Sequence, residues 1–418
     1  MENLIRKWTE SSLIIRILCG LGIGTILGII FKKYDVIGFP GELFIKALRG
    51  IAPILVFALV ASNLSKAGEG IGNRFKIIIF LYLVSTFLSA IIAVSANFIF
   101  PVKMPINETK DKMFASSDNN NLGDILKNIF LSIFENPLVS LSQGGYLGIL
   151  FWAIIIGYCL KKNAKESTLN MLSDFSDVIS LIVRGIIQFA PIGIMCLIYT
   201  AVAENGIKIF YKYGKLILLD VSCVFIVTFI TNPLIVFIIL RSNPYPLILT
   251  CLKESGLTAF LTRSSAANIP VNLRLCEKLG LDKDFYSVSI PLGSTINMGG
   301  SAITISVMTL TLCNKLGINV SIDKSIVLTF ISTLAACGTS GVSGGSLLLI
   351  PMACSLFGIS DEDSEKAIHV GFIIDVIQDS CATALNSSSD VVFTATADYF
   401  EKNKKGEKSY NLREIVND

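Results

Sequence analysis

The chain has 418 residues, of which 52% are hydrophobic and 16% are charged. With a mean hydropathy of +0.66, this composition excludes an ordinary soluble globule and indicates a polytopic membrane protein. The formal net charge of +3 gives no support for a nucleic-acid partner. The ten cysteines occur singly, without CxxC or Cys/His spacing, which predicts small buried side chains and not metal ligands.

The first apolar run extends from Leu13 to Phe31 and follows Arg6 and Lys7. It is too long for the apolar region of a signal peptide and ends in Phe-Lys-Lys, without a small-residue cleavage site. We therefore expect an uncleaved transmembrane helix. Its glycines predict a small face for close helix contact, made by Gly20, Gly22, Gly24 and Gly28.

Further apolar stretches are long enough to span a bilayer, at about 43–63, 76–101, 146–160, 176–203 and 215–240. The polar stretch from Val102 to Gly123 is predicted to be a long loop. Helical pieces at 122–135 and 146–160 are interrupted by Asn-Pro and Gly-Gly, which indicates a segmented span. Prolines inside predicted helices are expected to bend them at Pro53, Pro191 and Pro233.

Basic residues indicate the orientation, because they are enriched in cytoplasmic loops. If the N-terminus lies inside, the cytoplasmic segments hold Lys66, Arg74, Lys76, Lys161, Lys162, Lys165, Arg241, Arg274, Lys278 and Lys283. The opposite side then holds Lys32, Lys33, Lys103, Lys110, Lys112, Lys208 and Lys212. We predict both termini in the cytoplasm, with 401–418 as a charged tail.

Two segments of the second half share one plan. Between about 245 and 275, two short helical pieces flank T-R-S-S-A-A-N-I-P; between about 322 and 357, two apolar pieces flank C-G-T-S-G-V-S-G-G-S. Each piece is too short to cross a membrane alone, and irregular backbone at membrane depth is tolerated only in protein or beside a cavity. This pattern favours an inverted-repeat transporter with a binding site near the midplane over two ordinary loops.

Between these segments, the helix predicted at about 284–313 contains P-L-G-S-T-I-N-M-G-G-S-A. Glycines weaken the helix and expose carbonyl groups, while Thr295, Asn297 and Ser301 add neutral oxygens. Such oxygens suit a hard monovalent cation, although a glycine-rich packing face is the alternative.

The last apolar stretch, from Gly371 to Thr396, carries Asp375, Asp379, Asn386 and Asp390. At about 100° per residue these four fall within roughly 60° on one face of a helix. An acid at bilayer depth costs about 2.5–3.5 kcal/mol, so this face must meet cations, donors or water. The alternatives are ion pairs that lock helices together and a site for a transported cation; the scarcity of basic residues in the neighbouring spans favours the second.

These motifs resemble the dicarboxylate/amino acid:cation symporter family over nearly the whole chain. The residues that carry the resemblance are Thr262-Arg263-Ser264-Ser265, Asn268-Ile269-Pro270, Asn297-Met298-Gly299-Gly300-Ser301, Gly338-Thr339-Ser340-Gly341-Val342 and Asp375 through Asp390. Within the family they look most like the bacterial sodium-coupled transporters of serine and threonine.

The resemblance implies an all-α polytopic fold with eight transmembrane helices, two re-entrant helical hairpins, inverted repeats and a homotrimer. Residues 1–400 would form a single transporter domain. Its scaffold would come from about 1–63 and 122–204, and its transport core, which moves as an elevator, from about 76–101 and 215–400.

The resemblance also implies roles for single residues. Asp379 corresponds to the acid that binds the substrate ammonium, and Asn386, Ser265 and the backbone of Val342 to groups that bind its carboxylate. Ser264 lies with Ser265 at the first hairpin tip; Thr383 and Ser301 would face the substrate side chain. One sodium site would consist of Asp390, Asn386 and carbonyls of Gly293 and Asn297, and another of carbonyls of Thr295, Cys337 and Thr339.

Departures from the family pattern refine this expectation. Family members that carry acidic substrates have an arginine where this chain has Ala382, so a second substrate carboxylate would be buried unpaired. Arg263 could reach the pocket, but an ion pair with Asp379 or Asp375 is the preferred interpretation. Gly299 replaces an aspartate of a third sodium site whose other positions resemble Tyr82, Ser85 and Thr86. We expect one or two coupled sodium ions.

These expectations amount to a transporter and not an enzyme. It would import L-serine and L-threonine with sodium across the plasma (inner) membrane of a bacterium, surrounded by membrane lipid. The alternatives are the same fold with alanine or a dicarboxylate as substrate, or coupling to protons. A cation channel would need a continuous pore and a repeated filter, and neither is visible in the sequence.

Overall fold

The computed structural model describes residues 13–31, 35–66, 72–106, 131, 133–143, 146–339 and 344–406, and in these residues every regular element is a helix. Most of the helical piece predicted at 122–135, and most of the loop before it, lie outside these ranges. The predicted all-helical class is therefore confirmed for the described chain.

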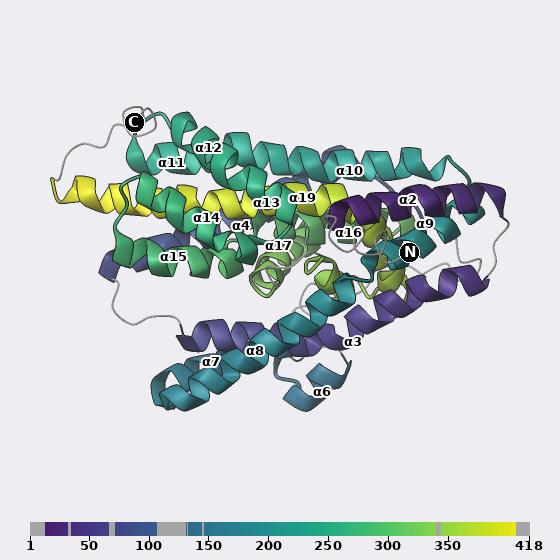
Figure 1. The fold of residues 1–418 in the computed structure, drawn as a ribbon, viewed down its shortest axis with the longest axis horizontal. Helices are drawn as coiled ribbons and strands as arrows, with labels where there is room; N and C mark the ends of the chain where they lie inside the picture. Colours follow the sequence, from purple (N-terminus) through teal and green to yellow (C-terminus); the bar gives the residue numbers. More distant parts are fainter. Residues whose placement is uncertain are drawn as a thin grey trace, which may run out of the picture.

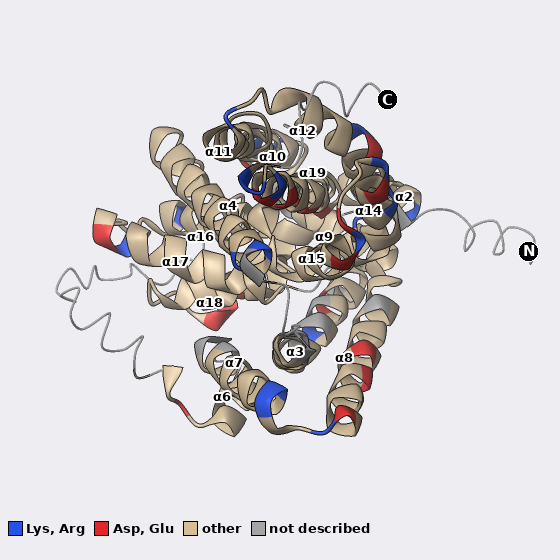
Figure 2. Ribbon diagram, turned by 90° about the vertical axis from the view of Figure 1, so that its left-hand side faces the viewer, with Lys and Arg blue, Asp and Glu red and all other residues tan. Residues whose placement is uncertain are grey.

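The helices form two groups (Figures 1 and 2). In the first, α3 packs against α7, α8 and α9, and α9 packs closely on α2. The members of this group are α2 (Leu13–Ile30), α3 (Asp35–Lys66), α6 (Pro137–Gln143), α7 (Tyr146–Asn163), α8 (Glu166–Ile187) and α9 (Ala190–Asn205). In both views α3, α6, α7 and α8 lie on one side of the molecule.

The second group surrounds the longest helix, α19 (Asp361–Lys404). Its other members are α4 (Gly72–Ile99), α10 (Ile209–Ile226), the π-helical turn η1 (Val227–Thr231), α11 (Asn232–Leu240), α12 (Tyr245–Cys251), the π-helical turn η2 (Leu252–Gly256), α13 (Leu257–Thr262), α14 (Ser265–Lys278), α15 (Lys283–Ile296), α16 (Gly299–Leu316), α17 (Ile322–Cys337), the 3₁₀ turn η3 (Leu347–Leu349) and α18 (Ile350–Ser355). The division into a scaffold and a moving core stays a prediction.

Four continuous helical segments of the described chain are long and apolar enough to cross a membrane: Arg74–Ile99, Ile209–Leu240, Lys283–Leu316 and Asp361–Lys404. The pair α8 and α9, whose axes differ by 50°, makes a fifth if counted as one broken span. Pro191 lies in the first turn of α9, so the predicted bend at this proline is confirmed. By length and composition alone, the described residues contain fewer spans than the predicted eight.

The glycines of α2 permit its close contact with α9. A Cβ added to Gly20 or Gly24 would collide with backbone atoms of α9, and one on Gly28 would lie 2.9 Å from the carbonyl oxygen of Tyr199. These three residues are four apart and so share one helix face. Gly22 was also predicted to belong to this face, but a Cβ there would meet nothing within 4 Å.

Both interruptions predicted in the second half occur. The first hairpin consists of α12, η2 and α13, a break at Arg263 and Ser264, and the returning helix α14. Its two arms are joined by a 2.5 Å hydrogen bond from Ser255 Oγ to Asn272 Oδ1. The second consists of α17, an interruption that includes residues outside the described ranges, and then η3 and α18.

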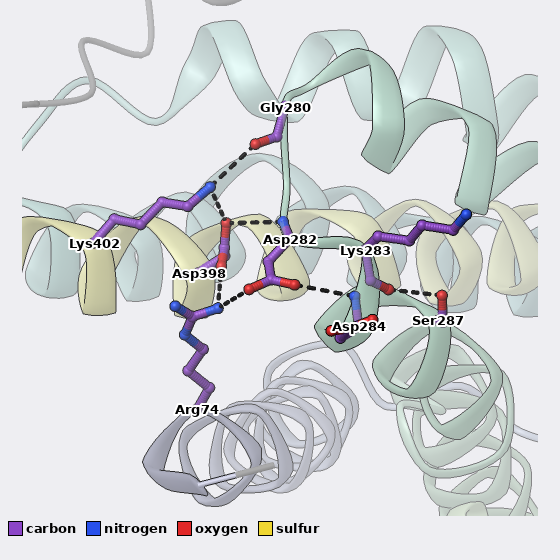
Figure 3. A network of polar contacts seen from close by, with 8 residues as sticks. All are labelled: Arg74, Gly280, Asp282, Lys283, Asp284, Ser287, Asp398 and Lys402. Atoms are coloured by element: carbon purple, nitrogen blue, oxygen red, sulfur yellow. Dashed lines mark hydrogen bonds and ion pairs between the residues drawn. The ribbon is translucent and has the colours of Figure 1, made fainter. Parts of the chain in front are cut away.

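A polar network joins α4 to the end of α19 and the loop before α15 (Figure 3). Arg74 Nη1 donates to Asp282 Oδ2 at 2.8 Å and to Asp398 Oδ1 at 3.0 Å, while Lys402 Nζ lies 2.7 Å from Asp398 Oδ2. Partial burial raises the pKa of Asp282, but hydrogen bonds from Arg74 and backbone N–H groups, with the charge of Arg74, lower it below its usual value. A carboxyl group whose pKa is lower in the folded state stabilises the fold at pH values above its unfolded pKa of about 3.9. The stabilisation from Asp282 is therefore lost only as the pH falls through its lower, folded-state pKa.

The two acids of this network are expected to differ in their effect on stability. The Asp398 side chain is fully buried between Arg74 and Lys402, whereas that of Asp282 is 40% exposed. Asp398→Asn should lower the free energy of unfolding by about 3 kcal/mol, because it leaves two bases with one acid. Asp282→Asn, the matched control, should cost less than about 1 kcal/mol. Thermal unfolding of the purified variants tests this, and equal losses would contradict it.

Candidate functional site

The polar stripe of α19 is buried in protein. Asp375, Asp379, Asn386 and Asp390 are exposed by only 3%, 8%, 4% and 0%. They face the first hairpin, α15 and α16, which pack along α19. Because these elements supply polar groups, the stripe meets protein partners and not lipid, as its composition predicts.

Arg263 of the first hairpin pairs with both of the upstream acids. Its Nε donates to Asp379 Oδ2 at 3.0 Å, and its Nη2 forms an ion pair with Asp375 Oδ2. The arginine is 3% exposed and has a φ of 53°, a left-handed conformation that a non-glycine residue adopts at some cost in energy. The ion pair preferred from the sequence is present, and it holds the hairpin tip against α19.

Asp390 has no such base. None of the Lys, Arg and His side chains in the described ranges forms an ion pair with it, and its Oδ2 has no hydrogen-bond partner among those residues. Its Oδ1 accepts a 2.9 Å hydrogen bond from Asn297 Nδ2. The Oδ1 of Asn297 is likewise buried without a partner in the described chain, so two acceptor oxygens remain available at this point.

Asp390 is one of the residues predicted to form the first sodium site. The break between α15 and α16 brings the other residues predicted for that site close to it. Asn297 caps α15 and also donates to the carbonyl oxygen of Asn386 at 3.3 Å. A Cβ at Gly293 would lie 2.7 Å from both Asp390 Oδ1 and the hydroxyl of Tyr82. The absence of a side chain at Gly293 therefore leaves its backbone directly beside the carboxylate. Gly293, Asn297, Asn386 and Asp390 come together at one place in the fold.

The residues predicted to form the second sodium site lie where α17 meets the break between α15 and α16. Cys337 Sγ donates to the carbonyl oxygen of Ile296 at 3.6 Å, next to Thr295, whose hydroxyl donates to Leu292. Thr339 donates to Ala336 at 2.7 Å and to Ser301 Oγ at 3.4 Å. The end of the first arm of the second hairpin is thus joined to the start of α16.

The remaining predicted substrate contacts lie near Arg263 or on the facing helices. Ser264 caps α14, where its Oγ accepts a 3.2 Å hydrogen bond from the Ala267 N–H. Ser265, Thr383 and Ser301 are buried, with 2%, 6% and 8% exposure. Val342 lies outside the described residues.

Ala382 and Gly299, the two residues that depart from the family pattern, lie where helices pack closely. A Cβ on Gly300 would lie 2.6 Å from both Cα and Cβ of Ala382, so α16 and α19 touch there through their backbones. The N–H of Gly300 donates to Asn386 Oδ1 at 2.7 Å. A Cβ on Gly299 would lie 2.7 Å from Ser89 Oγ.

A second polar cluster, which was not predicted, holds the first hairpin on α19. Asn268 Nδ2 donates to Ser387 Oγ at 2.8 Å, and Asn272 Nδ2 donates to the Ser387 carbonyl at 3.0 Å. All three side chains are fully buried. The spacing of the two asparagines, four apart on one helix face, is the sequence signal that could have identified them.

Asp220 of α10 was also not singled out. It is 1% exposed, and neither carboxylate oxygen has a hydrogen-bond partner among the described residues. An acid within the apolar stretch 215–240 is the signal that would have drawn attention to it.

Comparison with known proteins gives a consistent result. The sequence profile of the sodium:dicarboxylate symporter family matches residues 13–400. Several relatives carry the name serine/threonine transporter SstT. The one from Streptococcus agalactiae serotype III is 49% identical over 411 residues, covering 98% of this chain and 100% of the relative. Those from Bifidobacterium adolescentis and Streptococcus thermophilus LMG 18311 are 50% and 48% identical over 399 and 398 residues, covering 96% and 95% of this chain and 92% and 98% of the relatives.

Proposed function

The chain belongs to the sodium:dicarboxylate symporter family, and we propose that it carries L-serine and L-threonine together with sodium across a bacterial inner membrane. A member of a symporter family is a transporter and not an enzyme. The names of the relatives, at about half identity over nearly the full length, support the substrate class.

The observation that carries this proposal is the imbalance of buried charge along α19. Asp375 and Asp379 share the guanidinium of Arg263, and Asp390 has no base among the residues that the structure describes. A buried carboxylate without a counter-charge is strongly unfavourable. Arg263 and the three aspartates together carry a net charge of −2, so bound cations stabilise the site. A zwitterionic amino acid, which has no net charge, and two sodium ions would neutralise it.

Asp379 is the proposed partner of the substrate ammonium group, and Asp375 makes this binding possible. In the structure the guanidinium of Arg263 already occupies Asp379, so an ammonium group must take its place. Arg263 keeps its second carboxylate at Asp375 during this exchange and does not become an unpaired buried cation. The exchange conserves the number of ion pairs, which keeps its cost low.

The pocket proposed here suits a neutral substrate. Ala382 offers no positive charge for a second carboxylate, and it lies in close contact with Gly300 of α16. Thr383 and Ser301 supply hydroxyl groups that can bond a substrate hydroxyl, which favours serine and threonine over alanine. Asn386, Ser264 and Ser265 are the proposed donors to the substrate carboxylate, together with the backbone of Val342.

Sodium is proposed to bind at Asp390 with Asn297, Asn386 and the backbone of Gly293, and at the carbonyls of Thr295, Cys337 and Thr339. The unpartnered oxygens of Asp390 and Asn297 fit the first of these sites. A third ion is not expected near Gly299, because this position carries no carboxylate and Ser85 already donates to Asn232 at 2.9 Å. Sodium and substrate then strengthen each other's binding by the same factor.

The remaining architecture is proposed from the family and from the packing. Eight spans and two re-entrant hairpins with inverted repeats would form a homotrimer, with both termini in the cytoplasm. Residues 1–63 and 122–204 would form the scaffold, and 76–101 and 215–400 the core that moves as an elevator. The separation of the described helices into two groups is compatible with this division.

The test is uptake of labelled L-serine by the purified protein in liposomes, with and without an inward sodium gradient. We expect sodium-dependent uptake that excess threonine blocks and aspartate does not. Uptake that follows a pH gradient without sodium would replace sodium by a proton. Transport of aspartate or of alanine but not serine would overturn the proposed substrate and the role of Ala382.

A further inference from the structure

A cavity of about 640 Å³ lies on the side of the second group of helices, between the start of α4, the end of α11 and the end of α19. This volume is in the range of sites for small ligands. Most of its lining is apolar, and two bases stand at its edge: the lining residues are Lys76, Ile77, Phe80, Leu81, Ile238, Ile239, Arg241 and Phe400. Figure 2 looks onto this end of the molecule, where α4 and α11 each pack against α19.

The cavity lies where α4 and α11 make few contacts with each other. The helix α4 packs against α10 and η1, and α11 packs against α19, but α4 and α11 hardly touch each other. Phe400 of α19 contributes to the lining between them. Phe80 and Ile238 are 65% and 59% exposed, so the apolar walls open outwards toward the place of the membrane.

The two bases are available for a ligand. No acidic residue lines the cavity. Arg241 follows the last residue of α11 with a left-handed φ of 55°, and its Nε donates to the Ile238 carbonyl at 3.2 Å. That bond leaves the other guanidinium donors of Arg241 without a partner in the described chain. Lys76 likewise has no ion pair there, whereas Arg74, two residues earlier, is engaged by Asp282 and Asp398.

We propose that this cavity binds an anionic phospholipid. The headgroup phosphate would lie between Lys76 and Arg241, and an acyl chain would follow the wall made by Phe80 and Ile238. An inorganic anion would leave that wall uncovered, and a neutral lipid would leave both bases without a net counter-charge. On the proposed orientation this end faces the cytoplasm, so the ligand comes from the cytoplasmic leaflet. A lipid bound here joins α4 and α11, which make few contacts with each other in the protein itself.

The test measures lipid binding to the delipidated full-length protein by native mass spectrometry and thermal shift, with phosphatidylglycerol and phosphatidylcholine as probes. The variant is Lys76→Gln with Arg241→Gln. Its control, Arg274→Gln with Lys283→Gln, removes one exposed arginine and one exposed lysine near the same end but outside the cavity. We expect phosphatidylglycerol to bind the cavity variant about 30-fold more weakly than the parent, since each base near an anionic lipid contributes about 1 kcal/mol. The control should bind like the parent, and phosphatidylcholine should not distinguish the three proteins.

Equal phosphatidylglycerol affinity of parent and cavity variant, or an equal loss in the control, would overturn the proposal. So would stabilisation of the parent by glycerol phosphate to the same extent as by the lipid, because the apolar wall would then have no role. The readout is binding and not uptake, so its failure is distinct from failure of the proposed transport function.

Discussion

Asp379→Asn is expected to reduce sodium-driven serine uptake at least 100-fold. The amide keeps the size of the side chain but removes the charge that neutralises the substrate ammonium, and loss of one partner of a buried pair costs about 3–5 kcal/mol. Arg263 retains Asp375 in this variant, so the first hairpin should stay on α19 and the protein should fold. Uptake in liposomes, together with thermal stability, separates loss of binding from loss of folding.

The matched control is Asp375→Asn, which removes the other carboxylate of the same arginine. Arg263 then has only Asp379 of the two acids and competes with the substrate for it. We expect the KM for serine to rise about 100-fold or more while uptake at saturating serine is largely kept, because substrate binding at Asp379 then leaves Arg263 as an unpaired buried cation. If both variants lost uptake to the same extent, the distinct roles proposed for the two acids would be wrong.

Gly300→Ala is expected to destabilise the protein by about 3 kcal/mol or more and to abolish uptake. The new Cβ would lie 2.6 Å from Ala382 Cα and 2.7 Å from its carbonyl oxygen. Overpacking commonly costs about 1–3 kcal/mol, and here the obstacle is backbone, which cannot rotate away. Separation of α16 from α19 would also break the hydrogen bond from Gly300 N–H to Asn386 Oδ1, and with it the proposed carboxylate and sodium contacts.

Gly214→Ala provides the control for this substitution. Gly214 lies in the exposed part of α10, and a Cβ there would meet nothing within 4 Å. Alanine is the better helix former, so a gain of about 0.5–1 kcal/mol is expected. The melting temperatures of the two purified variants, compared with that of the parent, test both expectations. A Gly300→Ala protein as stable as the parent would show that α16 and α19 are not in backbone contact.

The sequence by itself determined the class of the protein and indicated where its candidate site lies. A membrane protein follows from composition, and the break at Arg263–Ser264 follows from Ser and Asn between apolar pieces. The glycines of the helix predicted at 284–313 indicated a weak point, and the structure ends α15 at Ile296 and begins α16 at Gly299. The acid stripe of α19 was readable because the helical period fixes which residues share a face. These are local properties, in which each residue is constrained by its near neighbours in the chain.

Only the tertiary structure decided which side chains meet. Arg263 lies more than a hundred residues before Asp375 and Asp379, and it bridges both acids where the sequence left a choice between them. The contact of Gly300 with Ala382 depends likewise on how two helices cross. Within the described part of the chain, Asp390 is left without a base for the same reason. Such pairings arise from packing between distant elements, and no local periodicity encodes them.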